Sequence, residues 1–375
     1  MRKRLLTAAL TVILILSFAA CGPNDQDTNT FPIAAGERIS MPQDILIDGY
    51  SILLEDSYIF YSFTKDKEVT YFRQFFDGRC VEIGSVPDFA FSLGFHSQIG
   101  NGLYFYLTTA KSTEAVFENN AFENNLYCID LVSNALSVIR TESKCLPGAI
   151  IASLGDSIVS RQSERSPENH LSTYIELLDT QTGIVKKTSP IFVLDDNTNI
   201  GSYMMNMCVD GDYIYALIDE RHEDGSNSAY LYKYNKDFDI IQKIGLDAID
   251  EYILSARVGE MSVCGDCLYL KNYSRDAVVA VIEEDEVRLL LQKNGIQKAK
   301  QYESSSELVF FTHGGNTLYF YNPIRHELTQ QELVLDNGYL LKNIMEKDGT
   351  MLIATFAHAS SPTDTPEDIL LLIRN

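Results

Sequence analysis

The residues in this sequence best suited to redox chemistry are two cysteines separated by two residues, in Cys264-Gly265-Asp266-Cys267. In a redox protein such a pair opens a helix, whose N-terminus stabilises a thiolate. Here the pair lies between two short apolar segments and aligns with Asp210-Gly211-Asp212-Tyr213 further up the chain. We therefore interpret it as a turn followed by the start of a strand. No second pair at zinc spacing exists, so we expect no metal here.

Other chemistry-bearing residues are scattered. The six histidines form no HExxH or similar ligand spacing, and no GxSxG nucleophile motif is present. We interpret Thr312-His313-Gly314-Gly315-Asn316 as a hairpin loop, and the acidic runs Asp195-Asp196 and Glu283–Glu286 as solvated charge. The sequence therefore predicts no catalytic residue, no metal and no cofactor.

The elements that must position these residues form a repeat. A turn containing Gly-Asp, or a close variant of it, recurs between apolar segments rich in Tyr, Phe, Ile, Val and Leu, the residues that favour strands. A second and a third strand follow in most units. The turns are anchored at spacings of 45, 55, 56, 54, 40 and 42 residues by Asp56, Asn101, Asp156, Asp212, Asp266, Ser306 and Asp348.

Seven units of this length predict an all-β fold, a seven-bladed β-propeller of four-stranded antiparallel blades, because one such sheet cannot bury both faces alone. The last unit, which includes TMLIATFAHA and EDILLLIRN, is short of one strand. We expect residues 31–41 to supply it and so close the ring, since an open ring would expose sheet edges. In a propeller the turn aspartates are structural, because Asp and Gly suit tight turns.

This pattern of spacing and strands resembles the divergent bacterial extracytoplasmic β-propellers of YVTN and quinoprotein-like type over residues 31–375. The resemblance implies the fold and assigns no functional residue. Tryptophan is absent from the chain, so the Trp-bearing signatures of WD40 blades and of quinone-dependent propellers are missing.

The connections between second and third strands are expected to be loops on one face of the propeller. They are long at 108–125, 161–172, 219–229 and 357–367. Propellers commonly bind at such a face, where loops converge. The alternative is that these are tolerated insertions. The candidate ligand-binding residues are Arg161, Glu164, His170, Arg221, His222 and Glu223, within a wider rim that adds Glu118, Glu123 and Arg165.

The N-terminus is basic at Arg2, Lys3 and Arg4 and then apolar from Leu5 to Leu16, which is the pattern of a secretory signal over residues 1–20. The sequence FAAC at 18–21 resembles the bacterial lipoprotein lipobox. That resemblance implies cleavage before Cys21 and lipid attachment to its thiol, with residues 21–30 as a flexible tether. The alternative is ordinary cleavage after Ala20 beside an incidental cysteine.

Without residues 1–20, which hold three bases and no acid, the chain has 27 bases against 52 acids, a formal charge of −25. Such a surface repels phosphate backbones, so we expect no nucleic-acid partner. It also repels anionic lipid, so the lipid on Cys21 would do the anchoring. We expect a monomer outside the cytoplasm, tethered to the bacterial cell membrane, that binds a protein or small ligand. A propeller hydrolase or lyase acting on glycans or peptides is the alternative.

Overall fold

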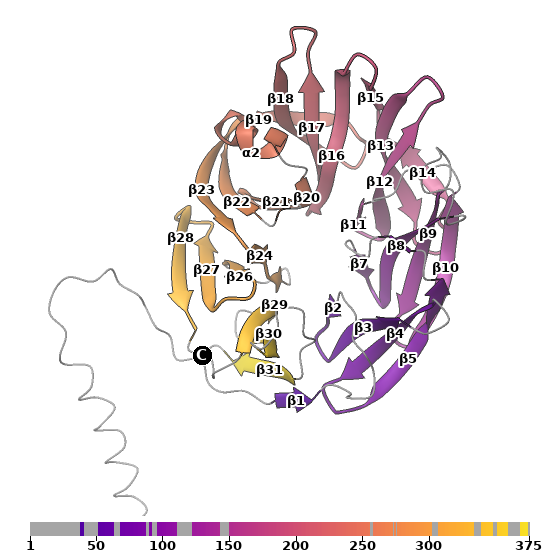
Figure 1. The fold of residues 1–375 in the computed structure, drawn as a ribbon, viewed down its shortest axis with the longest axis vertical. Coiled ribbons are helices and arrows are strands. Elements are labelled where there is room, and N and C mark those ends of the chain that lie inside the picture. Colours follow the sequence, from indigo (N-terminus) through magenta and orange to yellow (C-terminus); the bar gives the residue numbers. More distant parts are fainter. Residues whose placement is uncertain are drawn as a thin grey trace, which may run out of the picture.

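The computed structural model is a ring of mainly antiparallel sheets (Figure 1). It describes residues 38–40, 52–63, 68–87, 90–91, 96–110, 122–142, 150–255, 258–272, 274, 276–301, 307–333, 339–347, 351–358 and 368–373. Cys21, the signal and the tether lie outside these residues. Helix within them is confined to a 3-10 turn, Asp247–Ile249, and to α2, Asp250–Ser255. None of their helices has the length and apolarity needed to cross a membrane. The all-β propeller prediction is confirmed.

The first two sheets along the chain contain four and five strands. One has the order β2-β3-β4-β5, and the other β10-β9-β8-β6, with β7 also paired to β8. Their bounds are β2 Ile52–Leu53, β3 Ser57–Phe63, β4 Glu68–Phe75, β5 Cys80–Pro87, β6 Ala90–Phe91, β7 His96–Ile99, β8 Gly102–Ala110, β9 Phe122–Asp130 and β10 Ala135–Glu142.

The third sheet has nine strands in the order β11-β12-β13-β15-β16-β17-β18-β19, and β14 pairs with β13 beside this path. The bounds are β11 Ile150–Leu154, β12 Ser157–Arg165, β13 His170–Asp179, β14 Val185–Thr188, β15 Phe192–Asp195, β16 Ile200–Asp210, β17 Tyr213–Arg221, β18 Asn227–Tyr234 and β19 Ile240–Gly245.

The remaining sheets have the orders β20-β21-β22-β23, β24-β26-β27-β28 and β1-β31-β30-β29-β25. Their bounds are β20 Val258–Cys264, β21 Cys267–Asn272, β22 Asp276–Glu283, β23 Glu286–Asn294, β24 Ile296–Lys298, β25 Lys300–Gln301, β26 Leu308–Thr312, β27 Thr317–Asn322, β28 Glu327–Glu332, β29 Tyr339–Lys347, β30 Met351–His358, β31 Asp368–Ile373 and β1 Arg38–Ser40.

The described residues thus form six hydrogen-bonded sheets, where the sequence predicted seven separate blades. The difference arises at β15, which pairs with β13 on one side and with β16 on the other. It therefore joins two of the predicted units into one sheet, and a division into seven blades is not confirmed.

The N-terminal strand lies where the sequence placed it. β1 pairs antiparallel with β31, with Arg38 opposite Leu370 and Ser40 opposite Asp368 (Figure 1). Of the predicted closing segment 31–41, residues 38–40 belong to the described part of the chain. The pairing brings the two ends of the described chain into one sheet and covers an edge of β31 that would otherwise be open.

The recurrent Gly-Asp turns are tight two-residue hairpin loops. Leu154 pairs with Ser157 and Asp210 pairs with Tyr213 across such turns. The first turn residue is a glycine at positive φ, 55° at Gly155 and 54° at Gly211, where a side chain would be strained. The predicted turn role of these positions is confirmed in the described repeats. Ser306 and Asp348 lie outside the described residues.

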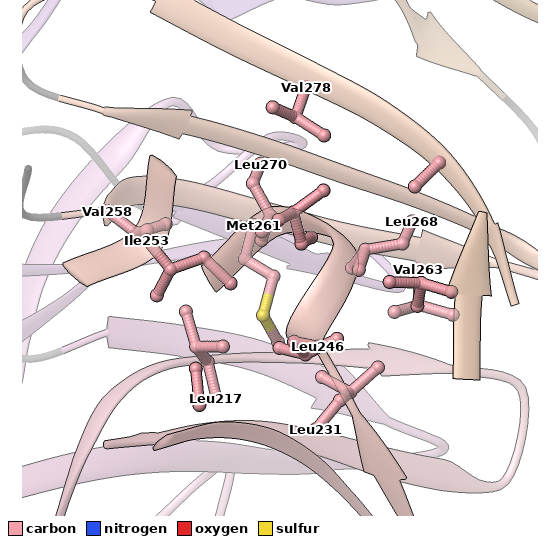
Figure 2. Packing of buried hydrophobic residues seen from close by; sticks show 14 of the residues in the cluster. Leu217, Leu231, Leu246, Ile253, Val258, Met261, Val263, Leu268, Leu270 and Val278 are labelled. Carbon is pink, nitrogen blue, oxygen red and sulfur yellow. The ribbon is translucent and has the colours of Figure 1, made fainter. Parts of the chain in front are cut away.

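Cores of aliphatic and aromatic side chains fill the spaces between neighbouring sheets. In one of them Leu217 and Leu231, from β17 and β18, pack with Leu268 and Leu270 of β21 (Figure 2). Leu246 lies in the same cluster, just before the short helical segment. Each of these side chains is fully buried. Truncating one to alanine typically costs about 2–5 kcal/mol, so these cores hold the sheets in place.

Candidate functional site

Four of the six candidate binding residues lie in strands of the nine-stranded sheet where the sequence predicted long loops: Arg161, Glu164, His170 and Arg221. β12 and β13 stay paired as far as Arg165 opposite Leu171, and β17 and β18 as far as Arg221 opposite Asn227. Segments 161–172 and 219–229 are therefore mainly strand, and only 166–169 and 222–226 turn. The prediction of long loops here was wrong, because the strands continue through these polar segments and bury Gln162, Ser163 and Asp219 between them. The connections within 111–121 and 359–367 lie outside the described residues.

β15 joins the β12–β13 hairpin to β16, the strand that pairs with the β17–β18 hairpin. Leu194 faces Leu171 of β13 on one side and Gly201 of β16 on the other. A Cβ on Gly201 would collide with the carbonyl oxygen of Val193, and Gly201 also has a φ of 122°. Only glycine allows so close a backbone approach in this conformation.

The strand register places the candidate residues on opposite faces of this sheet. Successive residues alternate between faces, and directly opposed residues share one. Arg165, Leu171, Leu194, Gly201 and Arg221 form one transverse row of opposed residues. We call the face that carries this row the arginine face; it also carries Arg161. The other face carries Glu164, His170, Ser172, Val193, Asp195 and Ile200. We call it the valine face.

On the arginine face, each arginine is held by protein groups. Arg161 Nε donates to the Met204 carbonyl oxygen at 2.8 Å. Arg165 forms an ion pair with Asp196, with 2.8 Å between Nη2 and Oδ2, and donates to Asn169 at 3.1 Å. These contacts tie turn 166–169 and the turn after β15 to the sheet. The arginines therefore serve the sheet's architecture and are not poised as free cations.

Arg221 anchors a buried polar cluster. Its Nε lies 3.0 Å from Oδ2 of Asp219, whose side chain is 3% exposed. Its Nη1 donates to Asn199, and its guanidinium lies 5.2 Å from the Tyr203 ring centre. Burial alone would lower the pKa of Arg221, but hydrogen bonding to Asp219 and its charge raise it above the ordinary value. Burial, followed by the Asp219 charge, raises the pKa of the Tyr203 hydroxyl.

The valine face is more open. Glu164 accepts a hydrogen bond from the Tyr174 hydroxyl at 2.6 Å. His170 Nε2 lies 3.9 Å from Asp195 Oδ1, and the His170 side chain is 45% exposed. Val193 is 44% exposed and Ile200 36%. Two exposed β-branched side chains thus lie on the same face as Glu164 and His170, and no periodicity in the sequence marked them.

His222 and Glu223 are exposed in turn 222–226, at the end of the β17–β18 hairpin. The turn is closed by a hydrogen bond from His222 N to the Ser226 carbonyl oxygen at 2.9 Å. The structure thus brings all six candidates onto one sheet but divides them between two faces and a tip. Within the described residues, His, Cys, Asp and Glu form no group of three or more able to hold a metal ion.

Polar contacts that join adjacent sheets were also not predicted from the sequence. Arg73 of β4 donates to Asp56 at 3.0 Å, and across to the Asn134 side chain beyond β9 at 2.9 Å. Tyr321 and His326 contact Asp266 from the neighbouring sheet. These pairs use turn aspartates of the repeat, which supports the predicted structural role of those residues.

No protein-family model matches this sequence, and no curated protein matches it significantly. Solved β-propellers resemble this chain. A chain described as "Crystal Structure of Mitotic Checkpoint Complex" superposes with a TM-score of 0.50 at 13% identity, covering 95% of this chain and 99% of its own. The β-propeller domain of the Trilobed protease from Pyrococcus furiosus, described as having an open velcro topology, gives 0.48 at 13% identity, with coverages of 87% and 96%. The C-terminal WD40 domain of Sif2 gives 0.41 at 11%, with 92% and 99%. At such identities the likeness concerns the fold alone.

Proposed function

We propose that this protein is an extracytoplasmic β-propeller lipoprotein that binds a protein partner through the valine face of its nine-stranded sheet. The observation that carries the proposal is the pairing of exposed Val193 and Ile200 with Glu164 and His170 on one side of that sheet. Apolar side chains within a polar rim supply desolvation energy and register together. In each of the two repeat units joined by β15, the second and third strands form a long hairpin, β12–β13 in one and β17–β18 in the other. These long hairpins make the surface broad.

We further propose that the ring has seven blades. Two four-stranded antiparallel groups, β11-β12-β13-β14 and β16-β17-β18-β19, can be distinguished within the nine-stranded sheet, and β15 then serves as a bridge between them. The repeat spacings of the sequence support this division. In this arrangement the valine face is built at the junction of two blades, which suits recognition of a large partner better than a single loop would.

Location follows from the N-terminal sequence. The basic, apolar and FAAC segments support export and lipid attachment at Cys21. The test is fractionation of cells that express the full chain. The wild-type protein should partition with membranes, whereas Cys21→Ser should release it or leave it unprocessed. A mutant that is cleaved and remains membrane-bound would refute the anchor.

The binding proposal is tested by pull-down from solubilised cell envelope with purified protein. Val193→Lys combined with Ile200→Lys should remove the partners bound by the wild type, because two charges replace the apolar part of the surface. The matched control is Ile324→Lys, since Ile324 is 88% exposed in the distant β27–β28 turn. If Ile324→Lys also lost the partners, or if the Val193→Lys and Ile200→Lys double variant kept them all, the binding site would lie elsewhere.

A further inference from the structure

Cys264 and Cys267 face one another across the β20–β21 hairpin. The strand register pairs them directly, and Gly265 and Asp266 alone form the turn. Gly265 has a φ of 60°, as a tight hairpin requires. Opposed residues of antiparallel strands have Cα atoms about 4.5–5.5 Å apart. That Cα separation is inside the range of about 4.4–6.8 Å for a disulfide. The Cβ atoms of opposed residues lie about 4.5–5.5 Å apart, so they must move to within about 3.5–4.5 Å for the two free thiols to form the bond.

Both thiols lie on the same side of the sheet. Cys267 is buried in the cluster that contains Tyr269 and Phe310, and the partly buried Cys264 packs against that cluster. Cys208 belongs to the cluster on the other side of β20, where its Sγ accepts a hydrogen bond from Val263 N at 3.2 Å. Because Val263 and Cys264 are neighbours on a strand, they point to opposite faces. The register and the faces therefore select Cys267, and not Cys208, as the partner of Cys264.

Neighbouring sheets hold the turn between the two cysteines. Gly265 N donates to Asp210 Oδ2 at 2.9 Å from one side. From the other side, the Tyr321 hydroxyl donates to Asp266 Oδ1 at 3.0 Å, and His326 Nδ1 lies 2.5 Å from Asp266 Oδ2. A turn fixed in this way keeps the two thiols close before any bond forms, so little conformational freedom remains to be lost on cross-linking.

We propose that Cys264 and Cys267 form a disulfide that closes this hairpin when the protein meets a disulfide oxidant. One thiol loses its proton and attacks one sulfur of the oxidant's disulfide bond. That S–S bond breaks, one half of the oxidant forms a mixed disulfide with the cysteine, and the other half leaves as a thiol. The second cysteine then attacks that mixed disulfide, releases a second thiol and closes the bond. The two cysteines lose two hydrogens in total, and the oxidant gains them. Burial raises the pKa of both thiols, which lowers the fraction of reactive thiolate and so slows the exchange.

Purified folded protein equilibrated with mixtures of reduced and oxidised glutathione tests this directly. After an acid quench, thiols are alkylated under denaturing conditions and located by peptide mass spectrometry. Alkylation of Cys264 and Cys267 should disappear together as the oxidised fraction rises, with a mass loss of ~2 Da for the two hydrogens. Buried Cys128 should remain alkylated throughout and serves as the internal control. In Cys264→Ser, Cys267 should stay alkylated under the same conditions.

Full alkylation of both residues in the most oxidising mixture would overturn the proposal, as would a bond from Cys264 to Cys208. Only the occurrence of the bond in cells depends on the proposed extracytoplasmic location. Because the measurement uses purified protein, failure of the lipid anchor or of partner binding would leave this result unaffected.

Discussion

The carbonyl oxygen of Val193 occupies the space that a Cβ on Gly201 would need. This contact brings β15 against β16 and makes one continuous sheet from two repeat units. Val193 itself is exposed on the proposed binding face, so the position that shapes the sheet lies beside a residue of that proposed face. Stability of the bridge and binding can therefore be separated by substitution.

Replacing Gly201 with alanine should destabilise the protein and detach β15. Gly78→Ala is the control, because Gly78 also has positive φ, 94°, but has open space where a Cβ would be added. The control isolates backbone strain, about 1–3 kcal/mol, and Gly201→Ala should cost more because it adds the clash. Urea unfolding monitored by circular dichroism measures both. Equal costs would mean that β15 does not approach β16 this closely.

Replacing Asp219 with alanine should cost about 3 kcal/mol of unfolding free energy. This is the lower end of the range for removing one partner of a buried ion pair, because Arg221 is still 24% exposed. Asp237→Ala, which breaks an exposed pair with Lys187 at 3.0 Å, should cost less than about 1 kcal/mol. Denaturant midpoints distinguish the two. A cost for Asp219→Ala no larger than the control's would show that the cluster around Arg221 is not formed.

Asp56 should contribute stability that is lost in acid. Burial alone would raise its pKa, but hydrogen bonds from Ser57 and Arg73, with the Arg73 charge, lower it overall. A carboxylate whose folded-state pKa is depressed stabilises above its unfolded pKa, about 3.9, and that stability is lost as pH falls through the lower folded value.

Wild type should therefore be more stable than Asp56→Asn at pH 7, and the difference should shrink below about pH 4. Urea midpoints at pH 7, 5, 4 and 3 follow the difference. A gap between the two proteins that stays constant over this range would rule out a depressed pKa for Asp56 as its source.

Deleting residues 31–41 should lower the melting temperature, whereas deleting residues 22–30 should leave it nearly unchanged. The first deletion removes β1 and its pairing with β31. Three ladder residues at about 1 kcal/mol per hydrogen bond predict a fall of roughly 4 °C. Calorimetry on both variants checks this. Equal tolerance of the two deletions would argue against closure of the ring by β1.

The turns could be predicted because their signals are local, and the closing strand could be predicted by counting the strands of the last unit. Gly155 and Gly211 are needed for positive φ at a tight turn, and the repeat spacing sets the strand order. The final unit's missing strand left residues 31–41 as its natural partner. The turn inference depends on backbone geometry that a few neighbouring residues determine.

The nine-stranded sheet could not be predicted, because the pairing of its strands depends on tertiary contacts. Gln162 and Ser163 are polar, so their segment suggested a loop, yet both are buried where β12 pairs with β13. The close approach of Val193 to Gly201 produces no repeating pattern in the sequence. The face on which each side chain lies depends on the strand register, and a shift of one residue would move every side chain of a strand to the other face. The prediction that the candidate residues share one rim was therefore wrong, because the register divides them between two faces and a turn.

The most direct test of the proposed partner-binding face is photo-crosslinking in intact cells, with a photoreactive amino acid placed at position 193 or at position 324. Position 193 should give a discrete adduct with an envelope protein, and that adduct should disappear when Ile200→Lys is added. Position 324 should give none. Adducts at 324 without any at 193, or adducts at 193 that survive Ile200→Lys, would contradict binding through the valine face.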